Sequence, residues 1–170
     1  FNKKISICIT GAGGSIGSEL CRQILSMNPY KLIIIDFCEY NLYKIYEELK
    51  ELKNSETKLV AKLLNAKNQI KLEDIFKEHK IKIVYHAAAY KHVPLVEINK
   101  IEGIRNNLAT TSAVSMAAIK NNVDKVVLIS SDKAVRPTNI MGATKLLSEL
   151  MIKELSSLSN CKTIFSTVRF

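Results

Sequence analysis

Tryptophan, long apolar runs and paired cysteines are all missing from this 170-residue sequence. No run approaches the roughly 18 apolar residues that a membrane-spanning helix needs, and residues 1–4 do not open an apolar segment of the signal-peptide kind. Disorder is excluded as well, because 47% of the residues are hydrophobic and 24% are charged, which is an ordinary globular balance. We therefore expect this stretch of chain to be soluble and to fold as one domain with a sizeable core.

Cysteine is scarce and dispersed along the chain. Cys8, Cys21, Cys38 and Cys161 form no C-x-x-C pair, and no cluster of cysteine and histidine has the spacing of a metal site. The pattern predicts free, mostly structural thiols in a reducing compartment and no bound metal.

Aromatic residues make up only 6% of the chain, whereas 25 lysines and arginines outnumber 16 acids and give a net charge of +9. Such an excess suggests nucleic acid, anionic lipid or a phosphorylated small molecule as a partner. Over residues 44–82, however, lysines and acids are interleaved, and the stretch has no aromatic-rich platform for single-stranded bases. We predict a solvated basic surface and no nucleic-acid partner.

The hydrophobic periodicity alternates between buried strands and amphipathic helices. Strands are predicted at residues 4–10, 31–36, 58–64, 81–86, 124–130 and 162–170, and helices at 18–27, 39–52, 70–79, 94–120 and 139–158. In the last helix, Leu146, Leu147, Leu150, Met151 and Leu155 are predicted to fill the core. This alternation predicts an α/β fold with a doubly wound parallel sheet, a Rossmann fold in the strand order 3-2-1-4-5-6.

One dinucleotide-binding domain is predicted over residues 1–170. The first residue is not methionine, and the β-rich segment 163–170 stops without a turn. We expect a fragment of a longer chain.

A glycine cluster stands where the first strand passes into the first helix. Gly11, Gly14 and Gly17 lie where the backbone must bend sharply and approach a ligand, and Ser15 and Ile16, between them, are assigned to the same cofactor site. The first amides of a helix point outward unpaired, so a pyrophosphate would lie on them. An ordinary strand-to-helix turn is the alternative interpretation.

Asp36 strengthens the cofactor interpretation because it ends the second strand, about 20 residues after the glycines. A carboxylate there accepts hydrogen bonds from the adenosine ribose and repels a 2′-phosphate, which favours NAD over NADP. Lys31 or Lys44 would weaken this preference if either one reached the ribose. The alternative is that Asp36 is a solvated strand end.

Small and polar residues follow the fourth strand. Ala87, Ala88 and Ala89 would let a cofactor lie close to the backbone, and Lys91 is positioned to meet a substrate phosphate or hydroxyl. His86 and His92 invite an acid–base or metal interpretation, but no third ligand has matching spacing, so we favour structural hydrogen bonding.

The segment after the fifth strand brings several polar groups to the same crevice. Ser131, Asp132 and Lys133 follow the strand directly, and Met141 lies one helical turn before Lys145. A short-chain dehydrogenase would show Tyr-x-x-x-Lys here. Methionine cannot carry a proton, so acid–base work would pass to Asp132 and Lys133. The alternative is a helix cap at Asp132 and a surface charge at Lys133.

These motifs resemble the extended short-chain dehydrogenase/reductases, and among them the polysaccharide-biosynthesis group of UDP-N-acetylglucosamine 4,6-dehydratases. The resemblance spans essentially the whole chain and rests on ITGAGGSIGSEL at 9–20, Asp36 with EYNLY at 39–43, HAAAYKHVPLVE at 86–97 and SSDKAVRPTNIMGATK at 130–145. Similar proteins oxidise the sugar at C4 with NAD(P)⁺, eliminate water across C5 and C6, and return the hydride to C6. Relatives continue into a smaller domain that holds the UDP-sugar.

The resemblance assigns roles to individual positions. Asp132 resembles the acid that protonates the departing C6 hydroxyl, Lys133 the base that removes the C5 proton, and Lys145 the group that holds the nicotinamide ribose. Met141 resembles the methionine-for-tyrosine branch, which leaves Ser131 as the hydroxyl near C4. Asn41 is assigned to the cofactor site, and Asn68 stands where relatives carry an aspartate near the adenine.

The resemblance also implies a homo-oligomer that uses a UDP-sugar to make a surface polysaccharide or a glycoprotein glycan. We expect it in the cytoplasm, or on the cytoplasmic face of the inner membrane if a membrane anchor lies outside this stretch. Two alternatives remain open: a nucleotide-sugar 4-epimerase or reductase, and a dinucleotide-binding module without catalysis.

Overall fold

The computed structural model describes residues 5–53, 56–159 and 161–170, so Lys4 of the predicted first strand lies outside the described residues. All six predicted strands are present, in one parallel sheet with the order β3-β2-β1-β4-β5-β6. The strands are β1 Ser6–Thr10, β2 Lys31–Asp36, β3 Lys58–Leu63, β4 Ile81–His86, β5 Lys125–Ile129 and β6 Ile164–Val168. The helices are α1 Ser15–Ser26, α2 Glu39–Leu52, α3 Gln69–His79, α4 Val93–Ile98, α5 Lys100–Lys120 and α6 Ile140–Ser156, with a 3₁₀ turn, η1, at Asp132–Ala134. The predicted Rossmann fold and strand order are confirmed.

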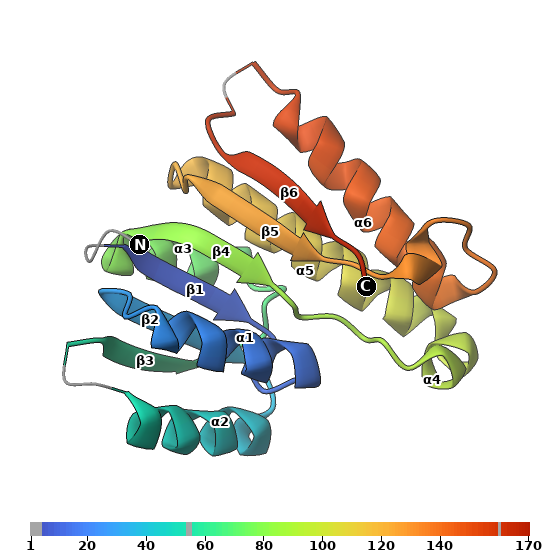
Figure 1. The fold of residues 1–170 in the computed structure, drawn as a ribbon. Coiled ribbons are helices and arrows are strands. Elements are labelled where there is room, and N and C mark those ends of the chain that lie inside the picture. The colour runs from blue at the N-terminus through green and yellow to red at the C-terminus, as the bar shows by residue number, and fades with distance from the viewer. Residues whose placement is uncertain (1–4, 54–55, 160) are drawn as a thin grey trace.

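Helices cover both faces of the sheet (Figure 1). Ile7, Ile9 and Leu32 of β1 and β2 pack in a core with α1 and α2. Cys8 and Ile33, which alternate with them, pack in a second core with α3 and α5. Because neighbouring residues of a strand point to opposite faces, a strand covered on both sides reads as a continuous apolar run. The described part of the chain contains no helix long and apolar enough to cross a membrane.

The structure divides the predicted helix at 94–120 into α4 and α5. Asn99 stands between them with φ −124° and ψ 50°, and its side-chain Nδ2 donates to the Leu95 carbonyl at 3.0 Å. Asparagine side chains compete in this way with the regular hydrogen bonds of a helix. Apolar residues continue on both sides of Asn99, so periodicity predicted one helix where there are two.

The prediction for the buried face of α6 is wrong. Leu147 and Leu150 are each 48% exposed, and Leu146, Met151 and Leu155 are only half-buried. The side chains that face inward are Met141, Thr144, Lys145, Ser148 and Ile152. The polar members of this set have partners: Asn107 Nδ2 donates to Thr144 Oγ1 at 2.9 Å, and Ser148 Oγ donates to the Thr144 carbonyl at 2.9 Å. A hydrogen-bonded polar seam between α5 and α6 therefore replaces the expected leucines.

All six strands run in the same direction, so their carboxyl ends meet at one edge of the sheet (Figure 1). The glycine cluster, Asp36, the three alanines and Ser131 all follow these strand ends. In doubly wound sheets the ligand crevice lies at this edge, near the point where the strand order reverses. That point falls between β1 and β4.

Candidate active site

The glycine cluster forms a tight loop between β1 and α1, which begins at Ser15 rather than at residue 18 as predicted. Gly11 has φ +71°, and a Cβ on it would lie 2.6 Å from the Ala88 backbone nitrogen. A Cβ on Gly17 would lie 1.9 Å from the Gly11 carbonyl oxygen. These two glycines therefore let the loop fold onto itself and onto the segment after β4.

The N-terminus of α1 opens into the crevice. Gly14 is its cap residue, and no side chain caps the first turn. The Lys91 ammonium Nζ donates to Ser15 Oγ at 3.2 Å. Unpaired helical amides beside a lysine suit a diphosphate, because the helix dipole and the ammonium both favour negative charge there.

On the β2–β3 side of this loop lies a cavity of about 160 Å³, here called the β2 cavity. The buried carboxylate of Asp36 accepts hydrogen bonds from the Gly13 amide and from the Cys38 amide, each at 2.9 Å. These bonds fix the carboxylate at the end of β2, so it is not a freely solvated strand end. The β2 cavity is lined by Gly11, Gly14, Ile35, Asp36, Phe37, Cys38, Asn41, Leu64, Asn65, Ala66, Ala87, Ala88, Ala89, Tyr90, Asn106 and Thr110.

Asn68, which was assigned to the adenine, has a different place. It is the cap residue of α3, and its Oδ1 accepts from the Lys71 amide at 3.1 Å. Asn65 lines the β2 cavity instead. Both residues are asparagines that follow β3, so residue type alone did not separate the cap from the cavity wall.

Neither lysine that left the NADP alternative open lines the β2 cavity. Lys31 begins β2 at the end opposite Asp36, and its ammonium lies 5.5 Å from the centroid of the Tyr30 ring. Five residues of a strand span about 16 Å. Lys44 acts electrostatically on Glu48 along α2. The described residues that line the cavity include no lysine or arginine.

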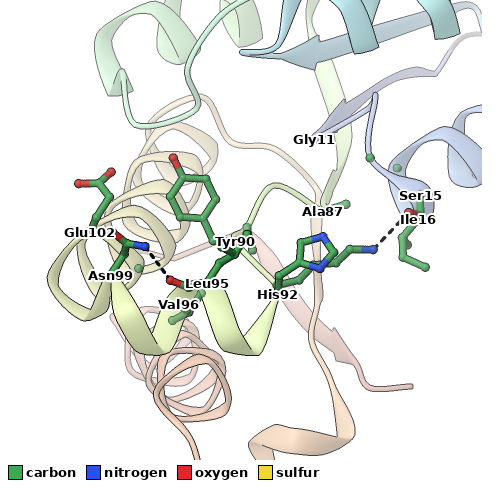
Figure 2. A pocket seen from close by; sticks show the side chains of 15 residues that line it. Gly11, Ser15, Ile16, Ala87, Tyr90, His92, Leu95, Val96, Asn99 and Glu102 are labelled. Atoms are coloured by element: carbon green, nitrogen blue, oxygen red, sulfur yellow. Dashed lines mark hydrogen bonds between the residues drawn. The ribbon is translucent and has the colours of Figure 1, made fainter.

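A larger cavity of about 390 Å³, here called the α4 cavity, extends from the glycine loop toward α4 and α5. Figure 2 shows Ser15 and Ile16 on one side, His92 in the middle of the view and Tyr90, Leu95, Val96, Asn99 and Glu102 on the other side. Gly11, Gly14, Gly17, Ala87, Ala89, Lys91 and Gly103 complete the lining. The two cavities share Gly11, Gly14, Ala87, Ala89 and Tyr90, so an extended ligand lying across the loop would reach both.

The two histidines near β4 have different surroundings. His86 is buried, and its Nδ1 and Nε2 lie 2.7 Å from Thr10 Oγ1 and 3.3 Å from Thr111 Oγ1. Its predicted structural role is confirmed. His92 is exposed at the cap position of α4, makes no capping hydrogen bond there and lines the α4 cavity. Among the residues that the structure describes, no three His, Cys, Asp or Glu side chains are grouped to hold a metal ion.

The structure brings Ser131, Asp132 and Lys133 together at the end of β5. Asp132 Oδ1 accepts from Ser131 Oγ at 2.9 Å and from Lys133 Nζ at 3.2 Å. These hydrogen bonds lower the pKa of the Asp132 carboxyl, so it is ionised at neutral pH. The Asp132 and Lys133 side chains are 71% and 49% exposed. They are open to a ligand, although neither lines the α4 or the β2 cavity.

Met141 and Lys145 are buried on α6, behind the segment of residues 131–133. Lys145 Nζ donates to the Ile129 carbonyl at 2.9 Å, and burial lowers the pKa of its ammonium to about 8. Sequence reasoning missed Gly142, whose absent Cβ would lie 2.4 Å from the Lys133 carbonyl oxygen. A glycine in the first turn of a helix, where it costs stability, is the sequence signal for this close approach.

Two further residues that hold the site were not predicted. Glu97 Oε1 of α4 accepts from the Ile140 amide at 2.5 Å, which ties α4 to the start of α6. Asn107 of α5 accepts from the Tyr90 amide at 2.8 Å and donates to the Tyr90 carbonyl at 3.0 Å. The segment after β4 is therefore anchored to α5, and α4 is anchored to α6.

Solved structures with the same fold include "X-ray structure of Pen from Bacillus thuringiensis", with a TM-score of 0.88, 32% identity and coverage of 100% of this chain and 51% of that one. A second is a UDP-glucose 4-epimerase of Stenotrophomonas maltophila with bound NAD and formylated UDP-arabinopyranose, with a TM-score of 0.86. It is 21% identical and covers 97% of this chain and 52% of that one, so it supports the fold alone.

Curated relatives include the capsular polysaccharide biosynthesis protein CapD of Staphylococcus aureus, 44% identical over 97% of this chain and 27% of the relative. A UDP-glucose 4-epimerase of Rickettsia prowazekii is 34% identical over 97% of this chain and 48% of the relative. A UDP-N-acetylglucosamine 4,6-dehydratase (inverting) of Campylobacter jejuni is 32% identical over 100% of this chain and 49% of the relative. The chain thus spans half or less of the curated relatives that it matches.

A family model described as "Polysaccharide biosynthesis protein" matches residues 7–170. The match includes the glycine loop, Asp36, the β4–α4 segment and the segment from Ser131 to Lys145. It confirms the resemblance drawn from these motifs: the chain belongs to the polysaccharide biosynthesis protein family.

Proposed function

We propose that this chain is the dinucleotide-binding part of a nucleotide-sugar 4,6-dehydratase that converts UDP-N-acetylglucosamine to a UDP-4-keto-6-deoxy sugar. The product would serve surface polysaccharide or glycoprotein glycan synthesis. The hydrogen-bonded pair of Asp132 and Lys133 carries the proposal, because the reaction requires one acid and one base at neighbouring carbons. The 32% identical dehydratase of Campylobacter jejuni supports it.

The residues present fit a nicotinamide dinucleotide. Asp36 and Asn65 in the β2 cavity suit the adenosine, and the uncapped start of α1 with Lys91 suits the pyrophosphate. We infer NAD rather than NADP, because Asp36 would repel a 2′-phosphate and the described residues that line the β2 cavity include no lysine or arginine. When bound, NAD⁺ would supply the hydride acceptor for C4 and the hydride donor for C6. The C4 hydroxyl proton would leave to solvent through the Ser131 hydroxyl, and the Lys133 ammonium would return a proton to C5 as C6 is reduced.

The chain's own residues would move the protons. A ketone at C4 acidifies the C5 hydrogen, so Lys133 Nζ can remove that proton while Asp132 protonates the departing C6 hydroxyl, which leaves as water. In the structure the pKa of Asp132 is lowered, so its carboxyl is ionised, and it accepts a hydrogen bond from Lys133 Nζ. Transfer of one proton along this hydrogen bond yields a neutral amine and a carboxylic acid, the forms that the reaction needs.

Burial by the substrate favours this transfer. Separated charges on Asp132 and Lys133 are stable while both side chains contact water, but desolvation penalises the charged forms. A sugar nucleotide covering the pair therefore favours the neutral forms of both. In this proposal Met141 brings no competing acid, Ser131 would supply the hydroxyl near C4, and Lys145 would supply a cation beside the cofactor ribose.

A nucleotide-sugar 4-epimerase is the second candidate, favoured by the 34% identical epimerase of Rickettsia prowazekii. Epimerisation inverts C4 and leaves C5 and C6 untouched, so it has no use for an acid–base pair that acts at those two carbons. The position for the tyrosine of a short-chain dehydrogenase holds Met141, but both reactions oxidise C4 and must move its hydroxyl proton. The pair of Asp132 and Lys133 therefore favours the dehydratase.

The test is mass spectrometry of UDP-N-acetylglucosamine after incubation in heavy water with NAD⁺ and the full-length protein. We expect loss of one water with deuterium gained at C5, and K133M should abolish both changes. K125M is the matched control, because it removes the same charge from the opposite end of β5. An unchanged formula with inverted C4 would make the protein an epimerase, and cofactor binding without any product would make it a binding module.

A further inference from the structure

Glu149 of α6 has a nearly buried carboxylate that accepts three hydrogen bonds from two residues. Its side chain is only 10% exposed. Oε1 accepts from Ser130 Oγ at 2.5 Å and from Arg169 Nε at 3.0 Å, and Oε2 accepts from Arg169 Nη2. The carboxylate therefore joins three elements: α6, the end of β5 and the segment after β6. None of the roles assigned above uses it.

Glu149 lies one helical turn after Lys145 on the same face of α6. Lys145 Nζ donates a hydrogen bond to the Ile129 carbonyl, and Glu149 Oε1 accepts one from the hydroxyl of the next residue, Ser130. Two consecutive residues at the end of β5 are thus bonded to two consecutive turns of α6. Ser131, Asp132 and Lys133 follow immediately, so these bonds set where the reacting segment begins.

The charge of Glu149 also acts on Lys145. Burial lowers the pKa of the Lys145 ammonium to about 8, and the Glu149 carboxylate opposes this shift. In the described part of the chain, the charged or titratable groups that act on Lys145 or on Glu149 include His86 of β4, whose pKa is itself lowered, and Arg169, which pairs with Glu149. Burying an ammonium is costly without an opposite charge, so removal of Glu149 takes away a charge that offsets the burial of Lys145.

We propose that Glu149 is a positioning residue for Lys145 and for the segment of residues 131–133: its carboxylate bonds the end of β5 to α6 and places a negative charge one helical turn from the buried ammonium of Lys145. The role rests on the proposed function, in which Lys145 meets the cofactor ribose as a cation.

The experiment is an NMR titration of the Lys145 Nζ resonance in lysine-labelled full-length protein without ligand, the resonance being the one that K145M removes. E149Q should lower the pKa of Lys145 below the parent's value, because the opposite charge one helical turn away is lost. R169Q removes a cation from the same cluster and should leave that pKa unchanged or raise it. E154Q, which removes an exposed acid from the same helix, should leave it unchanged.

A merely structural role predicts equal changes in E149Q and R169Q, since both break the same ion pair. Equal changes, or an unchanged pKa of Lys145 in E149Q, would overturn the proposal. Arg169 is exposed, so we expect R169Q to fold even if E149Q does not. A fall in the pKa of Lys145 in R169Q would also overturn the proposal. E149D restores the charge and should restore the pKa. The titration contains no substrate, so its outcome is independent of the water-loss assay.

Discussion

His86 is a histidine that the fold keeps neutral. Burial, together with the charge of Lys145, lowers its pKa from 6.5 to about 3. Between these values the unfolded chain binds a proton that the native chain does not, so the free energy of unfolding falls as the pH falls. Between pH 7 and pH 5 this one group removes about 2 kcal/mol.

We therefore expect H86Q to lose about 2 kcal/mol less stability than the parent between pH 7 and pH 5. Glutamine retains a donor and an acceptor for Thr10 and Thr111, so the comparison isolates the proton. Urea denaturation at the two pH values provides the measurement. Equal losses in the two proteins would mean that His86 takes up a proton in the native state.

Residues that follow strand ends were predictable one by one, because the edge of a parallel sheet places them in the crevice whatever the details of packing. Asp36, Lys91 and the three alanines were found in this way. Asn65 was missed, because it and Asn68 carry the same amide and only the geometry after β3 separates them. Glu149 was missed because its two partners, Ser130 and Arg169, follow different strands and lie far from each other in the sequence.

At the scale of elements, the contact between α6 and η1 depends on Gly142. G142A adds a Cβ that would lie 2.4 Å from the Lys133 carbonyl oxygen, so backbone must move. We expect a loss of about 1–3 kcal/mol in the free energy of unfolding, although alanine favours helices more than glycine does. Deuterium exchange at C5 should fall as well, because Lys133 is displaced.

The neighbouring residue provides the comparison for G142A. A143G lowers helix propensity by about 1 kcal/mol and introduces no clash, so it should destabilise without displacing Lys133. Urea denaturation and the exchange assay on both variants make the measurement. A G142A protein as stable and as active as the parent would show that α6 can shift without cost.

Element boundaries were less predictable than the elements themselves. Apolar periodicity locates a helix but does not register a single asparagine that interrupts it, as at Asn99. A prediction from periodicity also assigns the leucines of a helix to the core. In α6, hydrogen bonds from α5 to Thr144 and Ser148 draw the polar face inward and leave Leu147 and Leu150 outside.

At the scale of the whole molecule, long-range and short-range electrostatics favour different dinucleotides. The net charge of +9 attracts anions from a distance, and NADP⁺, the more negative dinucleotide, gains more from it. The fixed carboxylate of Asp36 acts at contact distance and is screened far less by salt. We expect NAD⁺ to bind at least about 10-fold more tightly, which corresponds to about 1.4 kcal/mol, and the ratio to grow with ionic strength.

Calorimetric titration of both dinucleotides at two salt concentrations makes this measurement. D36S should narrow the ratio, whereas E39Q, which removes an exposed acid from the first turn of α2, should leave it nearly unchanged. Tighter binding of NADP⁺ to the parent at high salt would refute the role of Asp36.

The bond from Glu97 to the start of α6 has a mechanical consequence. Lys91 lies between two fixed points, the Tyr90 backbone held by Asn107 and the helix held by Glu97. Two parts of the crevice are therefore joined into one stiff frame. One is the wall that would meet the phosphates, and the other is α6, the helix that carries Lys145. After β5, the side chains of Asp132 and Lys133 are exposed, and the hydrogen bonds found for them within the described residues join them to each other and to Ser131. We therefore expect the side chains of Asp132 and Lys133 to adjust when a sugar binds, while the frame stays in place.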